Sequence, residues 1–133
     1  MRRVLLVEDS ASMRAFVRAA LTSSAALGQL EIAEAQSGFD ALRLLPRGAW
    51  DLVITDINMP DINGLELISF IKKSEAHKTT PILIISTASS DRDRERGMTL
   101  GASGYLVKPF TSEALAEQVL AQMGAASSSG AHG

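Results

Sequence analysis

The sequence predicts an α/β protein, a single doubly wound domain in which five parallel strands alternate with five helices. Four short runs are almost purely aliphatic, as is typical of strands that helices cover on both faces. They are residues 4–7, 52–54, 82–85 and 105–107. Between them, apolar residues recur three and four positions apart, which indicates amphipathic helices. Strands that alternate with helices favour a parallel sheet with right-handed crossovers.

The first half of the chain supplies two helices and an edge strand. The apolar face of the helix predicted after the first strand consists of Met13, Phe16, Val17, Ala20 and Leu21. Residues 31–35 alternate polar and apolar side chains, which favours a strand at a sheet edge. Ser37 and Asp40 resemble a capping box, with Asp in place of Glu, that opens a helix through Leu45. Pro46 and Gly48 then end it.

The second half continues the alternation. Asn63 and Gly64 precede a helix whose inward residues are Leu67, Ile68 and Ile71. Residues 90–100 predict the weakest helix, because they are highly charged and contain Gly97. Thr111 is the expected N-cap of the last helix. We expect one domain over residues 1–124, followed by a flexible Ser/Gly/Ala tail or linker stub over residues 125–133.

Composition excludes several classes of function. Thirteen basic and fifteen acidic residues give a net charge of −2, which argues against electrostatic capture of nucleic acid or an anionic membrane. The chain has no cysteine, so disulfides and thiol catalysis are absent. No apolar run approaches the ~20 residues of a membrane span, and Glu8 and Asp9 interrupt the first run after four residues. We expect a cytoplasmic monomer without membrane insertion.

Polar residues follow the strands at the points where sites form in open parallel sheets. Glu8 and Asp9 follow the first strand, Asp56 the third, Thr87 the fourth and Lys108 the fifth. Three carboxylates and one ammonium would give this crevice a charge of −2, and such repulsion calls for a cation. Because all the ligands are oxygens, Mg²⁺ is the natural candidate. A carboxylate beside Mg²⁺ and a lysine is also placed to attack phosphorus.

Four motifs in order, each after a predicted strand, carry a resemblance to a known family. They are Val7-Glu8-Asp9-Ser10 with Ser12-Met13-Arg14; Asp56-Ile57-Asn58-Met59-Pro60 with Gly64-Leu65-Glu66-Leu67; Thr87-Ala88; and the run from Gly101 to Phe110. From about Arg3 to Met123 the chain resembles the receiver domain of two-component response regulators, most of all the single-domain regulators of chemotaxis. The resemblance implies a flavodoxin-like (βα)5 fold with strand order 2-1-3-4-5.

The resemblance also implies a role for each site residue. Asp56 would be the phosphoacceptor, forming 4-aspartylphosphate. Asp9, Asp56 and the backbone carbonyl of Asn58 would bind Mg²⁺, and Glu8 would hold a metal-bound water. Lys108, ahead of a cis bond to Pro109, and Thr87 would contact the phosphoryl group, while Tyr105 would move inward behind Thr87. Ala88 would leave access for the phosphodonor.

The implied function is a switch rather than an enzyme acting on a separate substrate. A sensor histidine kinase would phosphorylate Asp56, and the surface of the fourth helix, fifth strand and fifth helix would then bind a target. A flagellar motor switch or another motility component is the expected target, by analogy. The chain would catalyse only its own phosphoryl transfer and autodephosphorylation. Ile57 and Ser89 depart from the chemotaxis regulators, which have Trp and an acid there, and Asn58 and Ser89 bear on phosphoryl lifetime.

Other functions stay open at this point. The same chemistry would serve a phosphate sink, a phosphorelay carrier or a receiver belonging to a larger regulator. A phosphatase of the haloacid-dehalogenase type also uses an Asp nucleophile, but it needs a second Asp two residues on, where this chain has Asn58. A flavodoxin would need a phosphate-binding loop after the first strand, where Glu8 and Asp9 would repel the phosphate.

Overall fold

Five parallel strands form one sheet in the order β2-β1-β3-β4-β5 in the computed structural model, which describes residues 1–87 and 91–124. The strands are β1 (Arg2–Val7), β2 (Leu30–Ala35), β3 (Leu52–Thr55), β4 (Ile82–Ser86) and β5 (Gly104–Val107). All four pairings are parallel. The predicted fold class and strand order are therefore confirmed, and the alternating segment is the edge strand β2.

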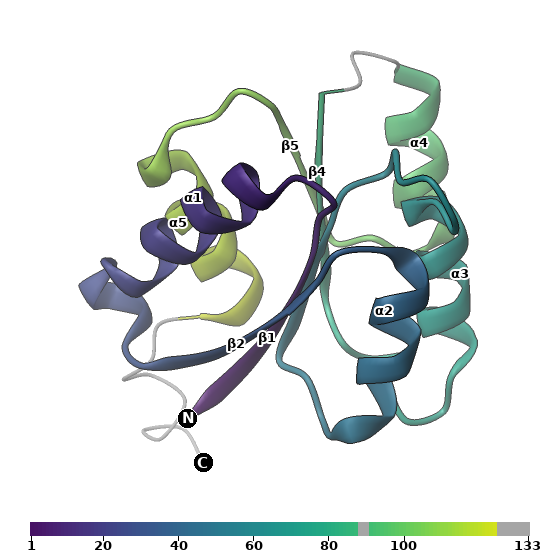
Figure 1. Ribbon diagram of the computed structural model, residues 1–133, viewed down its shortest axis with the longest axis horizontal. Coiled ribbons are helices and arrows are strands. Elements are labelled where there is room, and N and C mark those ends of the chain that lie inside the picture. The colour runs from purple at the N-terminus through teal and green to yellow at the C-terminus, as the bar shows by residue number, and fades with distance from the viewer. Residues whose placement is uncertain (88–90, 125–133) are drawn as a thin grey trace.

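The helices cover the sheet on both faces (Figure 1). They are α1 (Ala11–Thr22), α2 (Gly38–Leu44), α3 (Gly64–Lys73), α4 (Asp91–Leu100) and α5 (Ser112–Met123), with 3₁₀ turns at Ala25–Leu27 and Leu45–Arg47. Helices α1 and α5 lie on one face, and α2, α3 and α4 lie on the other. None of the helices in the described ranges is long and apolar enough to cross a membrane.

Each face of the sheet has its own apolar core, because successive side chains of a buried strand point to opposite faces. In β1, Leu5 and Val7 pack in the cluster beneath α2 and α3, while Val4 and Leu6 pack beneath α1 and α5. All four side chains are fully buried. The predicted helical stripes supply the other half of each core, apart from Phe16, which is partly exposed and packs beside Phe110.

Side-chain caps set the helix starts. The Oγ of Ser10 accepts from the N–H of Met13, and the Oγ1 of Thr111 accepts from the N–H of Ala114. Asn63 and Glu66 form a reciprocal capping box at α3. Such caps each contribute about 1 kcal/mol.

The predicted capping box at α2 is wrong in one half. The Oγ of Ser37 accepts from the N–H of Asp40, as expected, but the Asp40 carboxylate accepts from the N–H of Gln36. The α-helix also ends at Leu44 rather than Leu45, because the last turn tightens into a 3₁₀ turn at Pro46. Pro46 is tolerated in the first turn of this 3₁₀ segment, because the first residues of a helix donate no backbone hydrogen bond within the helix.

Helix α4 is as poor in apolar anchors as predicted, and Gly97 is its buried residue within the described span. The glycine has a packing role that its sequence context does not reveal. A Cβ at Gly97 would lie 2.4 Å from Cδ1 of Ile84, so its absence lets α4 approach β4 closely. The predicted start of this helix at Ser90 lies outside the described residues, as does the predicted tail over 125–133.

Candidate functional site

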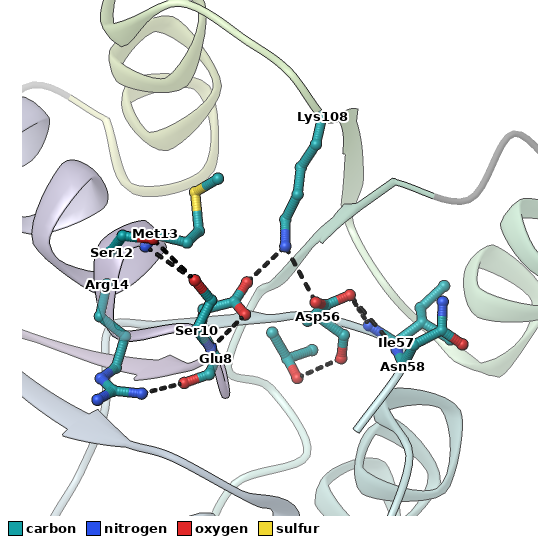
Figure 2. Close-up of polar contacts among 10 residues, drawn as sticks. Glu8, Ser10, Ser12, Met13, Arg14, Asp56, Ile57, Asn58 and Lys108 are labelled. Carbon is teal, nitrogen blue, oxygen red and sulfur yellow. Dashed lines mark hydrogen bonds and ion pairs between the residues drawn. The ribbon is translucent and has the colours of Figure 1, made fainter. Parts of the chain in front are cut away.

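The carboxyl ends of β1, β3 and β5 meet around one buried ammonium. The Nζ of Lys108 lies 2.6 Å from Oε1 of Glu8 and 3.0 Å from Oδ2 of Asp56. Figure 2 shows the lysine side chain directed between the two carboxylates. Glu8 is 1% exposed and Asp56 is 7% exposed, so these contacts are little screened by water.

A third carboxylate completes the cluster. One oxygen from each of Glu8, Asp9 and Asp56 lies within 4.8 Å of the other two. Asp9 is exposed, whereas the other two side chains are buried. With Lys108 counted, the group carries −2 when every member is ionised. The structure thus brings together the three predicted acids and the predicted lysine.

Burial and pairing act in opposite directions on these groups. Burial raises the pKa of Glu8, and although the contacts with Lys108 and the N–H of Ser10 oppose it, burial prevails. Burial acts to lower the pKa of Lys108, but its hydrogen bonds to Glu8 and Asp56 outweigh that effect and raise it. The lysine therefore stays charged, and it holds two carboxylates near each other at neutral pH.

Backbone groups fix the orientation of the two buried acids. The Oδ1 of Asp56 accepts from the N–H groups of Ile57 at 2.7 Å and Asn58 at 3.3 Å. The Oε2 of Glu8 accepts from the N–H of Ser10 at 2.9 Å. A Cβ at Gly64 would lie 2.2 Å from the carbonyl oxygen of Asp56. Because glycine has no Cβ, the start of α3 can pack directly against the backbone of Asp56.

An arginine that sequence reasoning missed supports the first strand end. The Nη1 of Arg14 donates to the carbonyl oxygen of Glu8 at 2.7 Å, and its Nε pairs with Glu34 of β2 at 3.2 Å. Arg18 pairs with the other Glu34 oxygen at 2.6 Å. The spacing of Arg14 and Arg18 on one helix face was a visible signal, but their partner lies on a strand that only the fold places beside α1.

The donor set fits Mg²⁺, which prefers carboxylate, carbonyl and water oxygens. Both carboxylate oxygens of Glu8 accept hydrogen bonds, from Lys108 and Ser10. Both oxygens of Asp56 also accept, from Lys108 and from two backbone N–H groups. Asp9 is the exposed member of the cluster. The acidic cluster is therefore a compatible magnesium site on its chemistry.

The remaining predicted residues lie in the loop after Asp56, at the end of β4 and on β5. Asn58 is exposed in the loop that follows Asp56. Thr87 is exposed at the carboxyl end of β4, next to β3 in the sheet. Tyr105 is half-buried on β5, and the guanidinium of Arg94 on α4 lies 5.5 Å from its ring centroid.

The Lys108–Pro109 peptide bond is cis, as the resemblance implies. The predictions for Ala88 and Ser89 concern positions outside the described residues.

Comparisons with known sequences identify the family of this chain. Residues 4–120 match the family model of the response regulator receiver domain. A chemotaxis protein CheY homolog of Campylobacter jejuni is 33% identical over 130 residues, which cover 97% of this chain and 98% of the relative.

Solved structures of response regulators have the same fold. The chemotaxis response regulator CheY4 of Vibrio cholerae superposes with a TM-score of 0.83 at 34% identity, covering 92% of this chain and 98% of that one. A putative response regulator from Chloroflexus aurantiacus gives 0.84 at 26% identity, covering 92% and 97%. With an acidic cluster and a lysine at the carboxyl ends of a 2-1-3-4-5 sheet, the chain belongs to the response regulator receiver domain family, as a CheY-like member.

Proposed function

We propose that Asp56 is the phosphoacceptor of this receiver domain and that its phosphorylation switches the protein between two states. The observation that carries the proposal is the position of Lys108, whose ammonium bridges Glu8 and Asp56 beside the exposed acid Asp9. An ammonium fixed 3.0 Å from a buried carboxylate can remain in contact with phosphoryl oxygens attached to that carboxylate.

The chemistry is a transfer between two carriers. A carboxylate oxygen of Asp56 forms a bond to phosphorus while the P–N bond of a donor phosphohistidine breaks, and the imidazole leaves. Asp9, Asp56 and the carbonyl of Asn58 would hold Mg²⁺, which would neutralise charge on the phosphoryl oxygens. Glu8 would hold a water at that site, and Lys108 balances the added negative charge. Water reverses the modification by hydrolysis of the acyl phosphate.

The switch acts through the next two strand ends. Thr87 follows β4 and Tyr105 lies on β5, paired in register with Ile84. A phosphoryl group on Asp56 offers oxygens to Thr87, and this favours the state in which Thr87 has moved toward Asp56. Tyr105 then moves inward, away from Arg94. The altered surface of α4, β5 and α5 binds the target.

The partners are a sensor histidine kinase and a target that recognises the phosphorylated form. Relatives carry the name of chemotaxis proteins, so a flagellar motor switch or another motility component is the proposed target. The same chemistry serves a phosphate sink or a phosphorelay carrier, and a long-lived acyl phosphate would favour the relay. Action as a cytoplasmic monomer belongs to the same proposal.

The test is the intact mass of the protein after incubation with acetyl phosphate, with and without Mg²⁺, followed over time. We expect one phosphoryl group that depends on Mg²⁺ and is lost in Asp56→Asn. Asp51→Asn is the matched control, because Asp51 precedes β3 at the other end of the sheet and binds the N–H of Arg3. Phosphorylation that survives in Asp56→Asn, or that disappears equally in Asp51→Asn, would overturn the assignment.

A further inference from the structure

Residues 58–63, the distal part of the loop between β3 and α3, are bonded to the start of α2. The Oδ1 of Asp61 accepts from the N–H of Gly38 at 3.1 Å, and its Oδ2 accepts from the N–H of Phe39 at 2.9 Å. These two N–H groups belong to the first turn of a helix and have no partner within it. One exposed side chain of the loop thus joins it to an element twenty-two residues earlier in the chain.

Packing reinforces the contact. A Cβ at Gly38 would lie 2.6 Å from both Cβ and the carbonyl oxygen of Ile62. The loop backbone therefore occupies the space that any other side chain at position 38 would need. Glycine at this place serves the approach of the loop, rather than the helix, in which alanine is more favourable by about 1 kcal/mol.

The two ends of this segment are bonded to Asp56 and Ile57, the two residues that directly follow β3. The N–H of Asn58 donates to Oδ1 of Asp56, and the N–H of Gly64 donates to the carbonyl oxygen of Ile57 at 2.7 Å. Between these two points Asn58, Pro60 and Asp61 are exposed. Asp61 provides the loop with a side-chain attachment to a neighbouring helix in the middle of this exposed stretch.

We propose that Asp61 is a positioning residue for the metal site: its bonds to Gly38 and Phe39 hold the loop so that the backbone of Asn58 is oriented for Mg²⁺. The inference rests on the proposed function, in which the Asn58 carbonyl is a ligand. Groups that orient metal ligands without touching the metal commonly change affinity by about 10-fold or more.

The ionisation of Asp61 suits this role. The N–H of Phe39, with further backbone N–H groups, lowers the pKa of Asp61 to about 2. The carboxylate is therefore charged at every pH at which the receiver chemistry operates, and hydrogen bonds to a charged acceptor are stronger than neutral ones.

A matched control exists in the same helix. Ser37 caps α2 through a bond from the N–H of Asp40 to its Oγ at 3.1 Å. Ser37→Ala weakens the start of α2 without removing a bond to the loop, whereas Asp61→Ala weakens the start of α2 and also frees the loop. Gly38→Ala acts in the opposite sense on the helix, because it favours helix formation while it displaces Ile62.

The experiment is titration calorimetry of the unphosphorylated protein with MgCl₂, together with the melting temperature of each variant. We expect Asp61→Ala to weaken Mg²⁺ binding by about 10-fold and Asp61→Asn, which retains an acceptor oxygen, to recover part of the loss. Gly38→Ala should also weaken binding, and Ser37→Ala should leave it within about 2-fold of the wild type despite a lower melting temperature.

Two results would overturn the inference. Wild-type affinity in Asp61→Ala would show that the loop needs no attachment, and equal weakening in Ser37→Ala would show that the stability of α2 alone matters. Asp9→Asn separates this from failure of the proposed function. If the wild-type protein binds no Mg²⁺, or binds it equally well after Asp9→Asn, the metal site itself is wrong and the inference fails with it.

Discussion

The two ends of the sheet differ in how well their charged side chains are paired. At the amino end, Arg3 lies 4.2 Å from the ring centroid of Trp50 and pairs with Glu31, while Arg2 donates to the carbonyl oxygens of Leu27, Met123 and Gly124. At the carboxyl end, Lys108 pairs with Glu8 and Asp56, and Asp9 adds a third acid to their cluster. The amino end matches each of these arginines with acceptors, whereas the carboxyl end has more negative charge than its lysine balances.

This difference separates stability from function. Paired and capped groups stabilise the folded chain without any ligand. An unbalanced acidic cluster lowers stability until a cation or a rearrangement supplies the missing charge. Changes at the carboxyl end should therefore alter stability together with phosphorylation or the response to it, and changes at the amino end should alter stability alone.

The largest effect is expected from Lys108→Ala. The substitution removes the cation from between two buried carboxylates, and breaking a buried ion pair costs about 3 kcal/mol. Phosphorylation should still occur, but target binding should no longer depend on it. The measurements are urea unfolding and partner binding with and without acetyl phosphate.

The stability loss from Lys108→Ala should also depend on pH. The folded-state pKa of Glu8 is raised above its ordinary value, so its contribution to stability decreases as pH rises through that pKa. Without Lys108 the pKa rises further, and the deficit should be larger at pH 7 than at pH 5. A deficit that shrinks toward pH 7 would contradict the assigned pairing.

The second effect is stabilisation by Mg²⁺. A cation that binds only the folded state at about 100 times its Kd adds about 2.7 kcal/mol. The melting temperature in MgCl₂ should rise for the wild type, and the rise should be abolished in Asp9→Asn. Arg2→Lys and Arg3→Lys, at the amino end, should leave the Mg²⁺-induced rise unchanged.

The sequence predicts one part of this contrast well. Glu8, Asp9, Asp56 and Lys108 follow strands that their own aliphatic residues identify, and a parallel sheet then brings strand ends together whatever the details of packing. The predicted helix starts at Asn63 and Thr111 are also local, because each cap bonds to an N–H three residues later.

What the sequence does not predict depends on contacts across the fold. Arg14 reaches the Glu8 carbonyl only because α1 lies against the edge strand that carries Glu34. Asp61 bonds to α2 only because the loop after β3 crosses its start. Gly97 alone predicts a weak α4, whereas the close approach of Ile84 in the fold explains why a glycine is needed there. No local pattern contains these partners.

At the amino end, Trp50→Phe should destabilise the protein by about 1 kcal/mol. It removes the hydrogen bond from Nε1 to the Leu45 carbonyl oxygen at 3.0 Å and a better ring for the Arg3 guanidinium. The rate of phosphorylation by acetyl phosphate should stay unchanged, which intact mass measures. A slower rate would show that the two ends are coupled through β3, and the contrast between them would fail.

A comparably small effect, of opposite sign, is the stabilisation expected from Asp56→Asn in the absence of Mg²⁺. Two unit charges 4 Å apart interact by about 4 kcal/mol at an effective dielectric constant of 20. Asp56 meets two such repulsions, from Glu8 and Asp9, and one attraction, from Lys108. Asparagine keeps an acceptor oxygen for the N–H groups of Ile57 and Asn58, and Lys108 keeps its shorter contact with Glu8.

Lys108 can move closer to Glu8, and water screens the exposed Asp9, so removing the Asp56 charge relieves only part of that repulsion. We therefore expect the free energy of unfolding to rise by about 1 kcal/mol. Urea unfolding in EDTA measures it, with Asp51→Asn as the control that should lose stability instead. A metal-free protein that Asp56→Asn leaves unchanged or weakens would mean that Lys108 already balances the cluster. The carboxyl end would then be a stabilising network like the amino end, and repulsion could not be the force that draws a cation to it.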